Sequence, residues 1–84
     1  MEAVILDLLA RAKAESYGLD LVRRSGGGLK VGTVYVTLQR MEQRGIVASR
    51  PEQKAPHVPG IPRRMYRPTA AGRTLYRAWR ALQG

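Results

Sequence analysis

The segment from Val31 to Arg44 carries residue types whose spacing suits an α-helix with one apolar face and one face of mostly short side chains. Apolar residues recur in it at intervals of three and four, at Val34, Leu38 and Met41, and this spacing predicts the buried face of an α-helix. Short polar or methyl-bearing side chains let a helix sink into the major groove, where threonine bonds base edges or phosphates and methyl groups touch thymine. We place on the outward face Thr33, Val36, Thr37, Arg40 and Arg44.

Residues beside this face are candidates for contacts with the DNA backbone. Tyr35 falls at the border of the two faces, where its hydroxyl can reach a phosphate. The amides and the positive dipole end at the start of a helix also favour a phosphate nearby, so we add Lys30. We expect a second basic group to grip the backbone, namely Lys54, Arg63 and Arg64. Each residue also has a plainer interpretation, in which Thr33 only caps the helix, Tyr35 is a core aromatic and the charges are solvated.

The sequence offers no constellation of residues for catalysis, a metal ion or a cofactor. Residues 25–33, SGGGLKVGT, invite comparison with a phosphate-binding loop, but no lysine follows Gly32 and no strand is predicted before the glycines. His57 is the only histidine, and it lies in a proline-rich segment without a carboxylate at ligand spacing. The chain also contains no cysteine. We therefore expect a protein that is not an enzyme and that holds no metal or cofactor.

The formal charge of +9 is confined to one part of the chain. Residues 1–28 contain four basic and four acidic side chains, whereas residues 29–84 contain eleven basic and two acidic ones. A basic region of this kind suggests a polyanionic partner, because neutralised phosphates release their condensed counterions. A generally basic, solvated surface is the alternative. Charge alone favours nucleic acid over that alternative.

These residues are carried by short elements. Periodicity and the positions of glycine and proline predict helices over 2–13, 16–24, 31–44 and 70–82, with strands over 46–50 and 64–67. Residues 51–62 contain four of the five prolines and are predicted to form a loop between the strands, while Thr69 is placed to cap the last helix. With 84 residues, the chain is expected to form one domain, mainly α with a small β-hairpin, in the winged helix-turn-helix arrangement.

The first and last predicted helices carry more apolar surface than a small monomer is expected to bury. Apolar residues fill most positions from Val4 to Leu9, and a single apolar stripe runs along the last helix. We expect a homodimer formed through Val4, Ile5, Leu8, Leu75, Trp79 and Leu82. The first apolar run is too short to span a membrane and lacks the cleavage site of a signal peptide, so we expect a cytoplasmic protein with no membrane partner.

Along nearly its full length, the chain resembles the PadR family of transcriptional regulators. The resemblance runs through SYGLDL at 16–21, through Gly-Thr-x-Tyr from Gly32 as far as Gly45, and through Arg-Arg-x-Tyr from Arg63 with Thr-x-x-Gly from Thr69. It implies a homodimeric winged helix that represses transcription by binding double-stranded operator DNA. It also implies that a small-molecule effector often relieves this repression. It further implies that Tyr35 and its helix neighbours meet DNA while the wing, which is the predicted hairpin over 46–67, reaches a flanking groove or the backbone.

The sequence departs from the family pattern in three places. Val36 stands where the family commonly has proline, and Thr37 where it usually has an apolar residue. The wing is longer than is usual, and the last predicted helix ends at 82, whereas family members often continue it as a dimerisation arm. Tyr76 and Trp79 could line an aromatic effector pocket or simply anchor the dimer or the core.

Two other functional classes remain open at the level of sequence. A basic winged helix can bind an acidic partner protein instead of DNA, and it can also bind RNA. A steep dependence of binding on salt favours nucleic acid, because phosphate contacts release counterions.

Overall fold

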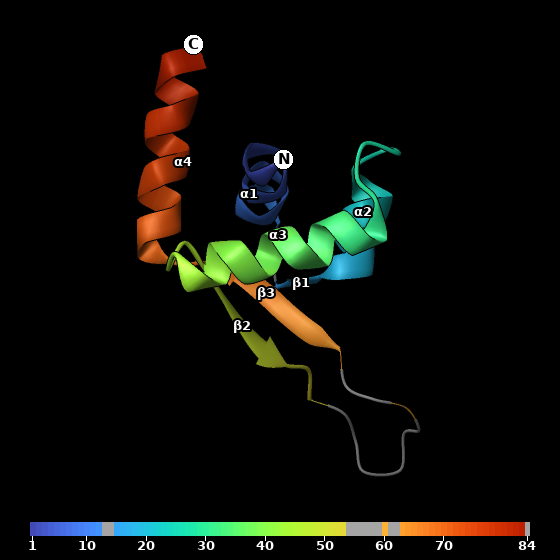
Figure 1. The fold of residues 1–84 in the computed structure, drawn as a ribbon. Helices are drawn as coiled ribbons and strands as arrows, with labels where there is room; N and C mark the ends of the chain where they lie inside the picture. The colour runs from blue at the N-terminus through green and yellow to red at the C-terminus, as the bar shows by residue number, and fades with distance from the viewer. Residues whose placement is uncertain (13–14, 54–59, 61–62, 84) are drawn as a thin grey trace.

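The computed structural model describes residues 1–12, 15–53, 60 and 63–83. In these parts of the chain, four helices and three short strands follow in the order α1 (Glu2–Arg11), β1 (Ser16–Tyr17), α2 (Gly18–Arg24), α3 (Val31–Gln43), β2 (Val47–Pro51), β3 (Arg64–Pro68) and α4 (Ala70–Gln83). Figure 1 shows α1, α2 and α3 gathered on one side of the sheet, while α4 extends away beside them. The predicted winged helix-turn-helix is confirmed, because a three-helix unit is followed by a β-hairpin and a final helix.

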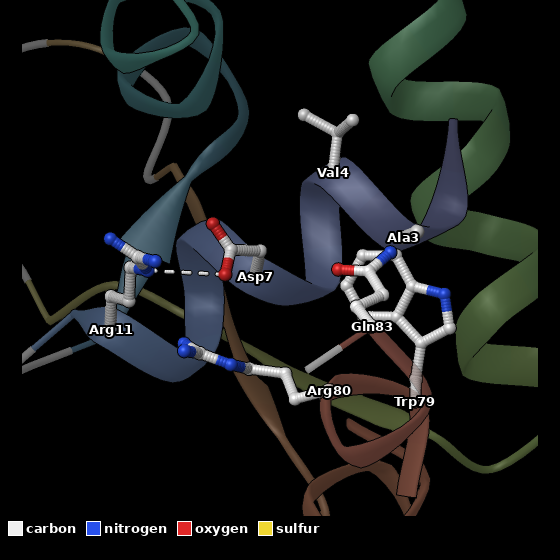
Figure 2. Close-up of a pocket in the computed structure, with 7 residues that line it drawn as sticks. All are labelled: Ala3, Val4, Asp7, Arg11, Trp79, Arg80 and Gln83. Carbon is white, nitrogen blue, oxygen red and sulfur yellow. Dashed lines mark hydrogen bonds and ion pairs between the residues drawn. The ribbon is translucent and has the colours of Figure 1, made fainter. Parts of the chain in front are cut away.

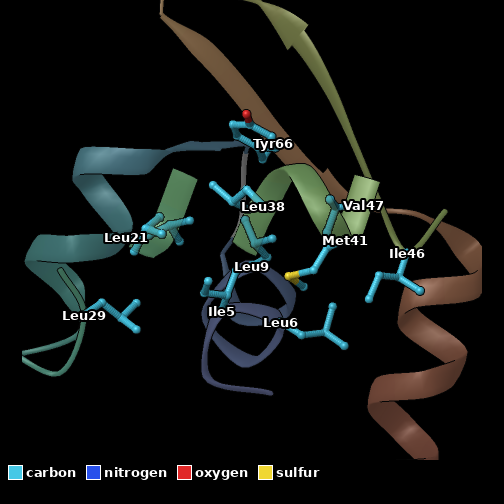
Figure 3. Close-up of a cluster of buried hydrophobic side chains, with 11 residues drawn as sticks. Ile5, Leu6, Leu9, Leu21, Leu29, Leu38, Met41, Ile46, Val47 and Tyr66 are labelled. Carbon is cyan, nitrogen blue, oxygen red and sulfur yellow. The ribbon is translucent and has the colours of Figure 1, made fainter. Parts of the chain in front are cut away.

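The core lies where α1, α2 and α3 meet the sheet (Figure 3). Its buried members are Ile5, Leu6, Leu9, Leu21, Leu29, Val34, Leu38, Met41, Ile46, Val47 and Tyr66. The α3 members recur at intervals of three and four, so one side of α3 faces inward along its whole length. The opposite side is consequently left free of the core.

The sheet has three antiparallel strands in the order β1-β3-β2. The predicted hairpin of β2 and β3 is confirmed, with Val47 opposite Pro68 and Pro51 opposite Arg64. The loop predicted between them lies mostly outside the described residues. The strand β1 was not predicted. Ser16 and Tyr17 were expected to start a helix, but they pair with the free edge of β3. Tyrosine suits an extended backbone, and this pairing satisfies edge groups that would otherwise stay open.

The bounds of the other elements differ slightly from the prediction. The first helix was expected to reach residue 13, but Ala12 is already extended. The third helix ends at Gln43, one residue early, where Arg44 and then Gly45 with its φ of 78° terminate it. No helix in the described part of the chain is long and apolar enough to cross a membrane.

The start of α4 is fixed to the turn that follows α3. As predicted, Thr69 caps α4, because its Oγ1 accepts a hydrogen bond of 3.0 Å from the Gly72 amide. The same hydroxyl donates to the Gly45 carbonyl at 2.7 Å, and the Thr69 amide donates to the Ile46 carbonyl at 3.1 Å. A Cβ at Gly72 would lie 2.0 Å from the Ile46 carbonyl oxygen. Only glycine therefore lets α4 approach this turn so closely.

Candidate nucleic-acid interface

The helix α3 presents an exposed face of short, mostly uncharged side chains opposite the core. Val34, Leu38 and Met41 have no exposed surface, which confirms the buried face predicted from their spacing. Thr33 and Arg40 are exposed as expected, and half of the Val36 surface is open to solvent. A helix with such a face can approach another surface closely, since few long side chains hold it away.

The prediction that Thr37 lies on this outward face is wrong. Its side chain is buried, with 6% of its surface exposed. Thr37 lies three residues after Val34 and four before Met41, so it shares the side of the helix that these core residues occupy. The predicted outward face was therefore rotated by about a quarter of a turn toward the core, at about 100° per residue.

With that rotation corrected, the outward face of α3 includes Gln39 and Gln43. Gly32, Val36, Gln39 and Gln43 recur at intervals of three and four along the side of α3 opposite the core, and all four are exposed. A glutamine amide can donate to and accept from an adenine edge at the same time. Sequence reasoning missed Gln39 and Gln43, although the positions of the core residues alone place them opposite the buried side.

Tyr35 is held at the edge of this face by a close contact with α2. Atoms of its ring and hydroxyl lie 2.6–2.9 Å from the position a Cβ would take at Gly18, so a side chain there would collide with the ring. Tyr35 is nevertheless 42% exposed. Its aromatic ring therefore packs on the backbone at the start of α2 without being a core residue.

The two arginines predicted on α3 have different surroundings. Within the described residues, the side chain of Arg40 takes part in no ion pair or hydrogen bond, and it is exposed. Arg44, by contrast, lies just past the end of α3 and forms an ion pair with Glu2 at the start of α1. Arg40 thus has no ion-pair partner among the described residues, whereas Arg44 joins two helices.

Arg64 is oriented by a chain of hydrogen bonds that links the wing to α3. Its Nε donates to the Ser49 hydroxyl at 3.0 Å, and that hydroxyl donates to the Glu42 carboxylate at 2.7 Å. Burial raises the pKa of the neighbouring Tyr66, and the Glu42 charge raises it further. These bonds occupy the Nε of Arg64, and no side chain in the described part of the chain binds the terminal nitrogens of its guanidinium group.

Arg63 lies elsewhere, although it directly precedes Arg64 in the sequence. Its guanidinium carbon is 4.4 Å from the centre of the Tyr17 ring on β1. Consecutive side chains of an extended chain point to opposite sides, so the two arginines cannot act as one pair. Of the other predicted backbone contacts, Lys30 is exposed directly before α3, and Lys54 lies outside the described residues.

The residues predicted for a dimer interface divide into buried and exposed groups. Ile5 has no exposed surface, so the prediction that it contacts a second subunit is wrong and it belongs to the core. Leu8 and Trp79 are half-buried. Val4, Leu75 and Leu82 are exposed within one chain, with Leu82 exposed by 88%.

The helices α1 and α4 border two clefts. Figure 2 shows the larger, of about 440 Å³, lined by Ala3, Val4, Asp7, Arg11, Trp79, Arg80 and Gln83. Arg11 donates a hydrogen bond of 3.1 Å to Asp7 at its side, and Tyr76 also donates to Asp7. The smaller cleft, of about 180 Å³, is lined by Glu2, Ala3, Leu6, Ile46, Leu75 and Trp79. Trp79 therefore forms a wall of both.

Solved structures of similar fold include regulators from several bacteria. The chain is similar in fold to Bacillus subtilis PadR in complex with operator DNA, with a TM-score of 0.77 and 23% identity over 93% of this chain and 45% of that chain. It is also similar to a PadR family regulator from Clostridium difficile R20291, with a TM-score of 0.73 and 27% identity over 98% of this chain and 88% of that chain. A third similar structure is a PadR family regulator from Eggerthella lenta DSM 2243, with a TM-score of 0.76 and 25% identity over 96% of this chain and 71% of that chain.

The family assignment follows from the sequence match. This chain spans less than half the length of Bacillus subtilis PadR. No curated protein matches it. The family described as "Transcriptional regulator PadR-like family" matches residues 5–78. Because this match covers most of the sequence, the chain belongs to the PadR-like family of transcriptional regulators.

Proposed function

We propose that the protein is a sequence-specific DNA-binding regulator that represses transcription by occupying an operator as a homodimer. The observation that carries this proposal is the outward face of α3, where short and amide side chains surround the exposed guanidinium group of Arg40. Such a face can enter a major groove, and the strands β2 and β3 of the wing lie next to α3 (Figure 1), which supports contact of the wing with the flanking backbone. The similar fold of Bacillus subtilis PadR in complex with operator DNA supports the same mode of DNA binding.

The side chains divide into those that read bases and those that grip phosphates. We assign reading to the exposed residues of α3, namely Thr33, Val36, Gln39, Arg40 and Gln43. Phosphate contacts are assigned to Lys30, Tyr35, Lys54, Arg63 and Arg64. Tyr35 fits this role because Gly18 fixes its ring while its surface stays partly open. Arg44 is left out of both groups, because its charge is balanced by Glu2.

The second copy in the homodimer covers the apolar surface of α1 and α4. Val4 and Leu75 are exposed, Trp79 is half-buried, and Leu82 is almost fully open, so one chain leaves this surface without a partner. Exposed apolar patches of this kind are rare on stable monomers. A symmetric pair would also present two copies of α3 to two half-sites.

A small-molecule effector is proposed for the larger cleft between α1 and α4. Trp79 gives this cleft an aromatic wall, and Arg80 gives it a cation in excess, since Arg11 is paired with Asp7 in the same lining (Figure 2). Together these groups suit an aromatic molecule with a negative charge. Trp79 is the only tryptophan, so quenching of its fluorescence by a ligand reports on this cleft directly. If a ligand quenches Trp79 fluorescence but does not release the DNA, then it binds the cleft without regulating DNA binding.

The test of the proposed function is a mobility-shift assay with DNA from upstream of the protein's own gene. We expect a shifted band that survives excess unrelated DNA and disappears with excess unlabelled upstream DNA. Equal competition by both DNAs would contradict operator specificity. Preference for double-stranded RNA, or binding only to an acidic protein, would replace the proposal with one of the two alternative classes.

A further inference from the structure

A cluster at the edge of the sheet joins Arg63, which is already assigned to a phosphate contact, to Arg23 and Tyr17, which have no assigned role. The guanidinium carbon of Arg63 is 4.4 Å from the Tyr17 ring centre, and that of Arg23 is 5.7 Å from it. Arg23 also donates a hydrogen bond to the Tyr17 hydroxyl. Three separate elements thus supply this cluster, namely β1, the last turn of α2 and the residue before β3.

The position of the cluster follows from the strand pairing. Tyr17 stands opposite Met65 in the β1–β3 ladder, so Arg63 is its diagonal neighbour, two residues along the other strand. The backbone of Arg63 is itself fixed, since its carbonyl accepts from the Glu52 amide at 2.7 Å and its amide donates to the Glu52 carboxylate at 3.1 Å. The cluster is therefore held by the sheet at the base of the wing.

The charges of the cluster are incompletely balanced. Arg23 forms an ion pair of 3.6 Å with Asp20, but Asp20 also pairs with Arg24 at 3.3 Å. These pairs lie at the surface, where water weakens them. The hollow of about 270 Å³ next to the ring is lined by Tyr17, Leu19, Val22, Arg23 and Arg63, and none of these residues is acidic. Two guanidinium groups that share such a hollow repel each other, so an anion between them would lower their energy.

The cluster also lies next to the helix that we assign to the major groove. Gly18 directly follows Tyr17, and the ring of Tyr35 from α3 packs on Gly18. A phosphate in the hollow would therefore be held by residues adjacent in sequence to Gly18, the point where α2 contacts α3. A nucleobase fits less well, because Arg63 already covers one face of the Tyr17 ring.

We propose that Tyr17 holds Arg23 and Arg63 as a two-cation clamp for one backbone phosphate beside the groove that α3 enters. This inference rests on the proposed DNA-binding function and adds a contact from α2 and β1, which sequence reasoning did not assign. Guanidinium groups bind phosphate through paired N–H donors, and stacking on an aromatic ring restricts the planes of those groups before the ligand arrives. Tyr17 is a positioning residue, since its ring acts through the two arginines.

The first experiment measures DNA affinity and its salt dependence for Tyr17→Phe, Tyr17→Leu, Arg23→Gln and Arg63→Gln. Each arginine variant is expected to bind specific and non-specific DNA roughly three- to tenfold more weakly. Its slope of log affinity against log salt should fall by up to about one unit. Tyr17→Phe keeps the ring beside Arg63 but removes the hydroxyl that accepts from Arg23, so its affinity should lie between the wild type and Arg23→Gln. Tyr17→Leu should resemble an arginine variant. Arg73→Gln on α4 removes the same charge elsewhere and serves as the control.

The second experiment locates the phosphate. Single uncharged methylphosphonate linkages are placed in turn along the bound DNA, and wild-type affinity should fall at one flanking position on each half-site. Arg63→Gln should lose most of its sensitivity at that position only, while Arg64→Gln should keep it. If the Arg23 and Arg63 variants were equally sensitive to a methylphosphonate linkage at every position, no single phosphate would be assigned to these arginines. That result would overturn the clamp.

The outcomes separate the clamp from the proposed function. If wild-type protein has no preferred DNA and a flat salt response, the DNA-binding proposal itself fails. If wild-type protein binds its operator while the Arg23, Arg63 and Tyr17 variants match it in affinity and slope, only the clamp fails. Should Tyr17→Leu unfold, which circular dichroism would reveal, the two exposed arginine variants still decide the matter.

Discussion

At the scale of single residues, the outward face of α3 combines three chemistries within one turn. Val36 offers methyl groups, Gln39 an amide and Arg40 a guanidinium, and all three side chains are exposed. These groups match the thymine methyl, the adenine edge and the guanine edge, respectively. The wing arginine Arg64 is instead fixed by Ser49, which suits a repeated contact with a backbone phosphate. Mutations on α3 are therefore expected to change sequence preference, whereas mutation of Arg64 is expected to change affinity for all DNA.

Gln39→Ala and Arg40→Ala should change which DNA sequences are preferred. Each good base contact that is lost should cost about 1–3 kcal/mol of discrimination. Arg64→Ala should weaken specific and non-specific binding alike, because a phosphate is present in every sequence. Selection of binding sites from a random DNA pool measures these effects for each variant. Thr37→Ala is the matched control, since its buried side chain should alter stability but leave the consensus unchanged.

The opposite pattern would reject this docking. If Arg40→Ala keeps the wild-type consensus and Arg64→Ala alters it, then α3 does not read the bases and the wing does.

At the scale of elements, the sequence predicts most of the fold but only part of the candidate site. Spacing identified the core side of α3, and Thr69 was recognised as a cap because its effect is local to four residues. The strand β1 was missed, since two residues carry no periodicity and their partner lies about 50 residues away. Thr37 was misplaced because a short polar residue was taken for a surface residue, although its spacing from Val34 and Met41 marks it as buried. The stacking of Arg63 on Tyr17 depends on strand register, which the sequence alone does not supply.

The junction between α3 and α4 should depend on the absence of a side chain at Gly72. Gly72→Ala would place a methyl group 2.0 Å from the Ile46 carbonyl oxygen, so the helix would have to move away from the turn. We expect a loss of about 2–4 kcal/mol in the free energy of unfolding. Urea denaturation followed by circular dichroism measures this loss.

Gly32→Ala provides the matched comparison for that substitution. Gly32 is also in a helix, and apart from its chain neighbours and the backbone of that helix no described heavy atom lies within 4 Å of the position its Cβ would take. Alanine should therefore raise stability, by up to about 1 kcal/mol, because glycine is the poorer helix former. Equal destabilisation by both changes would show that the close approach at Gly72 is unimportant.

At the scale of the whole molecule, the proposed dimer should depend on side chains that one chain leaves exposed. Leu82 is 88% exposed, so Leu82→Glu should leave the fold of a single chain intact. In the dimer it would bury a charge in an apolar contact, which costs several kcal/mol unless a partner is present. Sedimentation velocity should show a dimer for the wild type at micromolar concentration and a monomer for Leu82→Glu. Arg73→Glu, a charge change on the same helix outside the apolar stripe, should remain dimeric.

A stable wild-type monomer under these conditions would contradict the homodimer and, with it, binding to two half-sites. If the wild type and Leu82→Glu are both dimers, the interface lies elsewhere than the exposed stripe of α4.

The distribution of charge over the whole chain leads to a prediction about salt. The eleven basic and two acidic residues after position 28 include Lys30 directly before α3, Arg40 on α3, and Arg63 and Arg64 at the wing. A dimer that neutralises roughly 6–10 phosphates should lose about 10³–10⁵-fold in affinity between 50 and 200 mM salt, because each neutralised phosphate releases counterions. Fluorescence anisotropy with labelled operator DNA at stepwise salt concentrations measures the slope. A nearly flat response would favour a protein partner, whereas a steep response with no preference among DNA sequences would support nucleic-acid binding without operator specificity.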